Sequence, residues 1–141
     1  MESKASCNCG AATLNLQCAD APELSSILCH CSNCAKSSGS VGSNYIIVPR
    51  SAVSVEGDLT TYVDPNCESG LPLQRRFCGV CGSPVMAYSG KLGDSLCIIR
   101  TTMVSIPVKP GVHTYLRNAP EWMPRVEGTV GFKGAFGGEK V

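Results

Sequence analysis

The sequence predicts a mainly β fold of small antiparallel sheets. Three observations support this prediction. Short apolar and β-branched segments recur along the chain, and no window keeps a helical period. The 15 glycines and 9 prolines interrupt these segments at short intervals. Frequent breaks of this kind are typical of short strands joined by turns.

The predicted elements follow in chain order. Loose alternation (ATLNLQ) marks the segment 11–17, and NYIIV at 44–48 is β-branched and ends at Pro49. LCIIRTT at 96–102 has the same β-branched character. Two helical turns are expected, one after Cys31 and one near 113–118. The loop SSGSVGS at 37–43 is expected to be flexible. The predicted strands are 11–17, 26–29, 44–48, 59–63, 85–88 and 96–102.

The 141 residues correspond to one domain, 1–141, with a glycine-rich tail from about 128. The tail (GTVGFKGAFGG) is expected to be a mobile end with a few packed aromatic side chains. A net charge of +1 argues against a nucleic-acid partner. The longest apolar runs are too short to span a membrane, and MESKASCNCG has no apolar signal region. We therefore expect a cytoplasmic protein.

Ten cysteines are unusual in a chain of this length. Without a visible signal peptide, they favour metal binding in a reducing compartment over disulfides. Seven of them fall into three groups. These are CNCG at 7–10, CHCSNC at 29–34 and CGVCG at 78–82.

The two CxC and CxxC pairs that precede glycine predict one closed zinc site, formed by Cys7, Cys9, Cys78 and Cys81. The remaining group, Cys29, Cys31 and Cys34, supplies three thiolates from one loop and leaves a fourth position open. Alternatively, His30, Cys67 or Cys97 closes that second site. We expect two zinc ions per chain.

A zinc ion with three thiolate ligands carries a net charge of −1. Such a site favours a fourth sulfur ligand over the activation of water, so the chemistry points to a thiol or another sulfur-containing substrate. Cations near the site would have to offset the added charge. Lys36 is the nearest in sequence, and Arg75, Arg76 and Arg100 are candidates if the fold brings them close.

The sequence resembles the glutathione-dependent formaldehyde-activating enzyme family, which includes centromere-protein-V-like proteins. The matching segments are CNCG at 7–10, CHCSNCAKSSG at 29–39 and RFCGVCGSPV at 76–85, and the resemblance spans about residues 5 to 125. It implies an Mss4-like fold, a structural zinc at the four-cysteine set and a catalytic zinc at Cys29, Cys31 and Cys34. Members of the family often carry arginine where Lys36 stands here.

The activity that the resemblance implies is carbon–sulfur lyase chemistry, the reversible joining of a thiol such as glutathione to an aldehyde. We expect the loop that contains Lys36, Ser37 and Gly39 to hold the acid groups of the substrate. An enzyme of the same fold that acts on a related thioether is a further possibility. A non-catalytic, zinc-scaffolded binding module is the alternative from another class.

Four other side chains are candidates for roles near the site. His30 is expected to support the site or lie on the surface, and His113 to be either a general acid–base or a partly exposed turn residue. Cys97 lies in an apolar run and is expected to be a buried thiol. Cys67 lies in a turn-like segment, DPNCESG, and is expected to be exposed.

Overall fold

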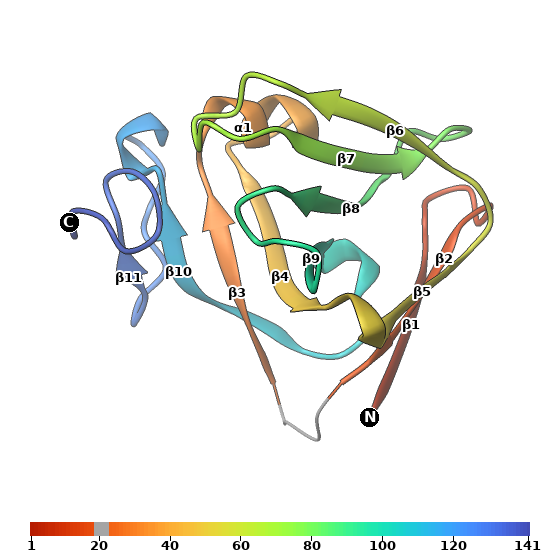
Figure 1. The fold of residues 1–141 in the computed structure, drawn as a ribbon. Helices are drawn as coiled ribbons and strands as arrows, with labels where there is room; N and C mark the ends of the chain where they lie inside the picture. The colour runs from red at the N-terminus through yellow and green to blue at the C-terminus, as the bar shows by residue number, and fades with distance from the viewer. Residues whose placement is uncertain (19–22) are drawn as a thin grey trace.

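The computed structural model describes residues 1–18 and 23–141, and these form the mainly β fold that the sequence predicts (Figure 1). One α-helix, α1 (Ser32–Ser38), and three short 3-10 helices accompany the strands. The 3-10 helices are Arg50–Ala52, Thr101–Met103 and Leu116–Asn118. The strands are β1 (Glu2–Ser6), β2 (Thr13–Gln17), β3 (Leu24–Cys29), β4 (Ser43–Pro49), β5 (Val53–Glu56), β6 (Leu59–Asp64), β7 (Leu73–Cys78), β8 (Pro84–Ser89), β9 (Leu96–Arg100), β10 (Val108–Thr114) and β11 (Val130–Gly131). Among the described residues, no helix has the length and apolar character needed to cross a membrane.

The strands form two sheets. A three-stranded sheet has the order β1-β2-β5, and an eight-stranded sheet has the order β11-β10-β3-β4-β9-β8-β7-β6. Most neighbours are antiparallel, but β10 runs parallel to both β3 and β11. The larger sheet is therefore mixed, which the prediction of small antiparallel sheets did not include.

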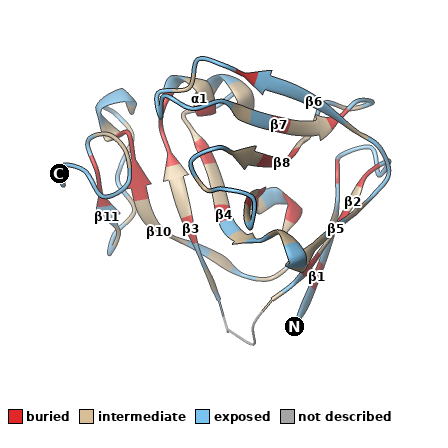
Figure 2. Cartoon of the chain, viewed as in Figure 1, coloured by how far each residue is buried: buried red, intermediate tan, exposed pale blue. Residues whose placement is uncertain are grey.

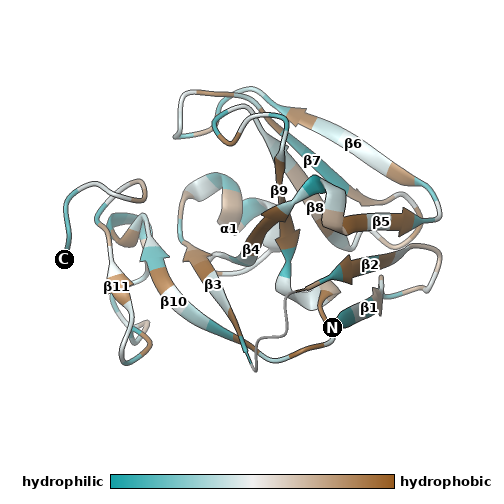
Figure 3. Ribbon diagram, turned by 60° about the horizontal axis from the view of Figure 1, so that its bottom comes forward, coloured by the Kyte–Doolittle hydropathy of each residue, from teal (hydrophilic) through white to brown (hydrophobic). Residues whose placement is uncertain are grey.

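The main core lies between the two sheets. Leu14 and Leu16 of β2 are fully buried and pack with Ile46 of β4 and Ile99 of β9. Figure 2 marks buried segments on these facing strands, and Figure 3 shows hydrophobic segments on β2, β5 and β4 where the sheets meet. Because side chains alternate across a strand, the neighbours of Ile46 and Ile99 point to the opposite face of the larger sheet. That opposite face forms the site described below.

Every strand predicted from the sequence is present, with ends shifted by a few residues. The strands that were not predicted, β1, β5, β7, β10 and β11, have weaker patterns. For example, β7 reads LQRRFC, and β10 contains Pro110 and Gly111. Neighbouring strands hold these segments in place despite low strand propensity.

Three predicted irregular segments are better ordered than expected. The turn after Cys31 is helix α1, which extends through Ser38, so the segment 37–43 begins inside a helix. The turn near 113–118 begins only at Leu116, because residues up to Thr114 belong to β10. The glycine-rich tail contributes β11, and its Phe132 is buried while Phe136 is 62% exposed.

Candidate functional site

Cys7, Cys9, Cys78 and Cys81 come together as the sequence predicts. Their four Sγ atoms all lie within 4.8 Å of one another. The Sγ atom of Cys9 lies 3.7 Å from that of Cys7 and 3.7 Å from that of Cys78. Four thiolates placed tetrahedrally at 2.3 Å from a zinc ion would be about 3.8 Å apart. This donor set therefore fits zinc.

The chain reaches this four-cysteine cluster through two tight turns. Gly10 and Gly82 adopt φ values of 81° and 76°, a left-handed conformation that favours glycine. The turns also aim backbone donors at sulfur: Ala12 N–H donates to Cys7 Sγ at 3.3 Å, and Val80 N–H donates to Cys78 Sγ at 3.4 Å. Cys7 and Cys9 follow β1, Cys78 ends β7, and Cys81 lies in the turn before β8. The cluster therefore joins the two sheets.

Cys29, Cys31 and Cys34 form a second cluster, with their Sγ atoms also within 4.8 Å of one another. All three are buried. Cys29 ends β3, and Cys31 is the N-cap of α1, where its Sγ accepts the Cys34 N–H at 3.3 Å. Cys31 thus takes the position that serine or threonine often occupies at a helix start. The local fold by itself aims three sulfur atoms at one point.

The charges around this three-cysteine cluster favour a cation. Hydrogen bonds from Cys29 and Cys31, followed by the charges of Arg75 and Arg100, lower the pKa of Cys34 to about 2. Hydrogen bonds with Cys29 and Cys34 raise the pKa of Cys31. The cluster thus retains negative charge at neutral pH, and a divalent cation with three thiolates would fit it.

Two buried arginines lie beside the three-cysteine cluster. Arg75 Nε donates to Asp64 at 3.0 Å, and Arg75 Nη1 donates to the Ser37 hydroxyl at 3.2 Å. Arg100 donates to the hydroxyls of Ser37, at 2.7 Å, and Ser43. Burial lowers the pKa of Arg100, and the negative charge of Cys34 opposes that shift. Among the described residues, Arg100 has no carboxylate in ion-pair range, so its charge acts on the cysteines.

None of the three residues proposed to close the second site joins it within the described part of the chain. His30 is buried with both ring nitrogens engaged, at 2.9 Å from His113 Nδ1 and 3.1 Å from the Val41 carbonyl. Cys97 is the buried core thiol that the sequence predicts. Cys67 is half-buried on the cavity wall. The expectation that His113 is a partly exposed turn residue is wrong, because it is fully buried in β10.

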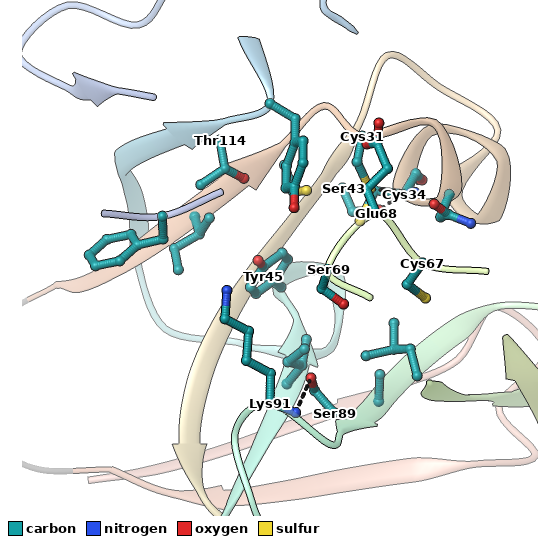
Figure 4. A pocket seen from close by; sticks show the side chains of 18 of the residues that line it. Cys31, Cys34, Ser43, Tyr45, Cys67, Glu68, Ser69, Ser89, Lys91 and Thr114 are labelled. Carbon is teal, nitrogen blue, oxygen red and sulfur yellow. Dashed lines mark hydrogen bonds between the residues drawn. The ribbon is translucent and has the colours of Figure 1, made fainter. Parts of the chain in front are cut away.

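A cavity of about 370 Å³ opens onto the three-cysteine cluster (Figure 4). Arg75 and Arg100 line it near the sulfur atoms, together with the hydroxyl-bearing side chains of Tyr45 and Tyr115. Lys91 and Glu68 bring opposite charges to its wall, and the lining includes Ile27, Ile47, Leu73, Leu92, Ile98 and Phe136. Glu68, Lys91, Tyr115 and Phe136 carried no signal in the sequence, because separate loops bring them here.

The three residues expected to hold the substrate lie outside this lining. Lys36 is exposed on α1, and Gly39 is the C-cap of that helix. Ser37 is one hydrogen bond removed from the cavity, since its hydroxyl accepts from both Arg75 and Arg100. Arg76 faces away and lies over the ring of Tyr88. Of the cations considered from the sequence, only Arg75 and Arg100 line the cavity.

Burial raises the pKa of the Tyr45 hydroxyl, and the negative charge of Cys29 raises it further. The pKa of Tyr115 is raised for the same two reasons in the same order. Both hydroxyls therefore remain protonated at neutral pH. They can donate a hydrogen bond to an oxygen atom bound in the cavity.

Comparison with known proteins shows the family to which the chain belongs. A crystal structure of a Rhodobacter sphaeroides protein is similar in fold, with a TM-score of 0.54 and 17% sequence identity. The match covers 77% of this chain and 100% of that one. No curated protein matches this chain. The family model for the glutathione-dependent formaldehyde-activating enzyme matches residues 2–118, which include all seven clustered cysteines. The chain therefore belongs to the glutathione-dependent formaldehyde-activating enzyme family.

Proposed function

We propose that this protein is a zinc-dependent carbon–sulfur lyase. It would join a thiol, glutathione or a similar one, reversibly to an aldehyde, or act on a related thioether. The observation that carries the proposal is that Cys29, Cys31 and Cys34 line a cavity of small-molecule size, beside two buried arginines. Family membership supports a thiol as the substrate.

Two zinc ions would have different roles under this proposal. Cys7, Cys9, Cys78 and Cys81 would hold one ion in a closed structural site. Cys29, Cys31 and Cys34 would hold the second, which when bound supplies affinity for a substrate sulfur and polarises a neighbouring oxygen. The three-cysteine cluster with zinc has a net charge of −1. Arg75 and Arg100 together with Asp64 bring the local total to neutral, so a fourth thiolate would add a single negative charge.

The two arginines would stabilise that extra charge. In the joining direction a carbon–sulfur bond forms, the thiol loses its proton and the aldehyde oxygen gains one. Arg100 is the better placed cation, because its hydrogen-bond partners are the neutral hydroxyls of Ser37 and Ser43. Arg75 shares its charge with Asp64. Ser37 would serve as a positioning residue that holds both guanidinium groups.

Tyr45 would donate a hydrogen bond to the oxygen atom of the adduct. Its hydroxyl lies on the cavity wall, and its raised pKa keeps the proton in place. A protonated phenol donates a hydrogen bond to an aldehyde oxygen and stabilises negative charge that develops there. Cleavage crosses the same transition state, so the phenol would again donate a hydrogen bond to that oxygen as the carbon–sulfur bond breaks.

The charged ends of the thiol would lie toward Lys91. This side chain is on the cavity wall and extends toward Tyr45 in Figure 4. Lys36 remains a proposed contact for the acid groups only at longer range, because it is exposed on α1 outside the lining. The contribution of Lys36 should therefore be screened by salt more strongly than a direct contact.

The test is exchange NMR of formaldehyde with glutathione at equilibrium, since thiols and formaldehyde also combine without a catalyst. Zinc-loaded protein should speed the interconversion above the spontaneous rate, and Cys31→Ser should abolish the increase. Cys18→Ser is the matched control, because Cys18 lies outside both clusters and the cavity. Equal rates with the native protein and Cys31→Ser would favour the zinc-scaffolded binding module instead.

A further inference from the structure

The cavity wall includes an apolar row of side chains set apart from the three-cysteine cluster. Resting on the lyase function proposed above, we propose that the carbon half of the substrate is an apolar organic group of several carbons. Formaldehyde contributes a single carbon and would leave this apolar wall uncovered. The substrate class is therefore a thioether or thiohemiacetal whose carbon substituent is an alkyl chain or an aromatic ring.

Strand register gives the order of the wall. Cys29 of β3 lies opposite Ser43 of β4 in the row nearest the sulfur atoms. In the next row, Tyr45 lies between Ile27 and Arg100. The row after that is apolar across three strands, because Ile47 lies opposite Ile98, and Ile98 opposite Ala87.

The apolar row lies beyond the reach of a one-carbon unit. Ser43 and Ile47 are four residues apart on β4, which corresponds to about 13 Å along an extended strand. An aldehyde carbon bonded to a sulfur at the cysteine cluster would lie near the first row. Only a longer substituent would contact Ile47 and Ile98.

Apolar side chains at this wall are left open to solvent. Ile47 is 38% exposed, and Phe136, which comes from the C-terminal segment, is 62% exposed. Both line the cavity. Covering them with an apolar group would remove hydrocarbon surface from water and favour binding. A peptide or protein partner fits less well, because the cavity lining includes a buried cysteine cluster and the volume of about 370 Å³ is that of a small-molecule site.

The test is calorimetric titration of the zinc-loaded protein with S-alkyl glutathiones of increasing chain length, which lack the hydroxyl of a thiohemiacetal and so cannot release an aldehyde. Each buried methylene should tighten binding by about fourfold. S-Hexylglutathione has five more methylenes than S-methylglutathione, so burial of two or three of them should tighten its binding by about 15- to 60-fold. Equal affinity for the methyl and hexyl compounds would overturn the inference.

Two variants test whether the gain in affinity with chain length arises at the apolar row that contains Ile47. Ile47→Asn should remove most of the gain with chain length, measured as the ratio of the affinities for S-hexylglutathione and S-methylglutathione within the same variant. Val63→Asn is the matched control, because Val63 is 54% exposed on β6 and lies outside the cavity lining. A chain-length gain that persists undiminished in Ile47→Asn would overturn the placement on this row.

Turnover separates this inference from the proposed function. Exchange NMR with glutathione and hexanal, compared with glutathione and formaldehyde, should show the larger acceleration for hexanal. Acceleration with formaldehyde alone, together with no chain-length gain in binding, would overturn the inference and leave the lyase function standing. A chain-length gain with no acceleration for either aldehyde would support the apolar ligand and overturn the lyase function.

Discussion

The Nε2 atom of His30 lies 2.9 Å from the Nδ1 atom of His113, and both rings are shielded from solvent. The Val126 N–H donates to His113 Nε2 at 3.3 Å, so the proton of a neutral His113 is on Nδ1. That proton is donated to His30 Nε2, and His30 Nδ1 in turn donates to the Val41 carbonyl. Every ring nitrogen is satisfied only when both histidines are neutral.

This histidine pair connects the three-cysteine cluster to distant parts of the chain. His30 lies between Cys29 and Cys31, His113 belongs to β10, and Val126 belongs to the segment that leads to β11. A buried hydrogen-bond chain of this kind holds the segment around His30, between Cys29 and Cys31, in one conformation. The pair therefore positions the cysteines on either side of His30, whose two ring nitrogens are both engaged in hydrogen bonds.

The first prediction concerns the dependence of stability on pH. Burial lowers the pKa of His113, and the charges of His30 and Arg125 lower it further. Below a pH of about 6.5 the unfolded chain takes up a proton at this position more readily than the folded chain, so the free energy of unfolding falls as pH decreases. Denaturant unfolding of zinc-loaded protein between pH 8 and about pH 5.5 measures this loss.

The control for this prediction is His113→Asn, which keeps a donor for His30 and cannot be protonated. Its free energy of unfolding should fall less with decreasing pH than that of the native protein. Identical slopes for the two proteins would show that His113 does not contribute to the pH dependence.

The second prediction separates the two cysteine clusters by their effect on folding. The four-cysteine cluster joins the two sheets, and a structural zinc ion supplies on the order of 10 kcal/mol of folding free energy. Cys81→Ser should therefore be largely unfolded or insoluble. Cys31→Ser should remain folded, with one zinc ion in place of two by elemental analysis. Comparable unfolding of both variants would instead make the three-cysteine cluster structural.

The third prediction concerns Arg100. Arg100→Lys keeps the charge but cannot reach the hydroxyls of Ser37 and Ser43 together, because lysine lacks the guanidinium fork. A charge-assisted hydrogen bond contributes roughly 1.5–3 kcal/mol, so the catalysed exchange rate should fall by about 10- to 100-fold. Arg76→Lys, on the opposite face of the sheet, is the control and should retain activity. Full activity in Arg100→Lys would contradict this role.

The fourth prediction concerns Tyr45. Tyr45→Phe should lower the maximal exchange rate by about a hundredfold, because the hydrogen-bond donor to the adduct oxygen is lost. The affinity for the thiol should remain nearly the same. Because burial and the charge of Cys29 raise the pKa of Tyr45, native activity should show no loss from tyrosine ionisation up to about pH 10. A decline near pH 10 that is absent in Tyr45→Phe would refute the raised pKa.

The fifth prediction compares two lysines. Lys91→Ala should weaken binding of glutathione relative to its diester by roughly two- to fivefold at low salt, as expected for an exposed ion pair. Lys36→Ala should have a smaller effect, since Lys36 lies outside the cavity lining. Titrations at low and high salt test both expectations. A larger effect of Lys36→Ala than of Lys91→Ala would show that Lys36, on α1, is the main contact for the glutathione carboxylates.

The sequence by itself determined the two cysteine clusters and the mainly β class of fold. Ligand spacing is local, because Cys31 and Cys34 lie in one helical turn and Gly82 provides the bend after Cys81. The strongest strands carried their own hydrophobic pattern. Zinc requires four ligands at a closed site, so the sequence also indicated that the pair at 7 and 9 joins the pair at 78 and 81.

Only the tertiary structure decided which other side chains belong to the site. Arg100 rather than Lys36 lies beside the cysteines, because β9 pairs with β4 and brings residues more than fifty positions apart into contact. His113 is buried because β10 pairs in parallel with β3, a long-range contact between segments without a strong pattern. Register across three strands likewise produced the apolar row of Ile47, Ile98 and Ala87, since side-chain alternation assigns faces only once the strands are paired.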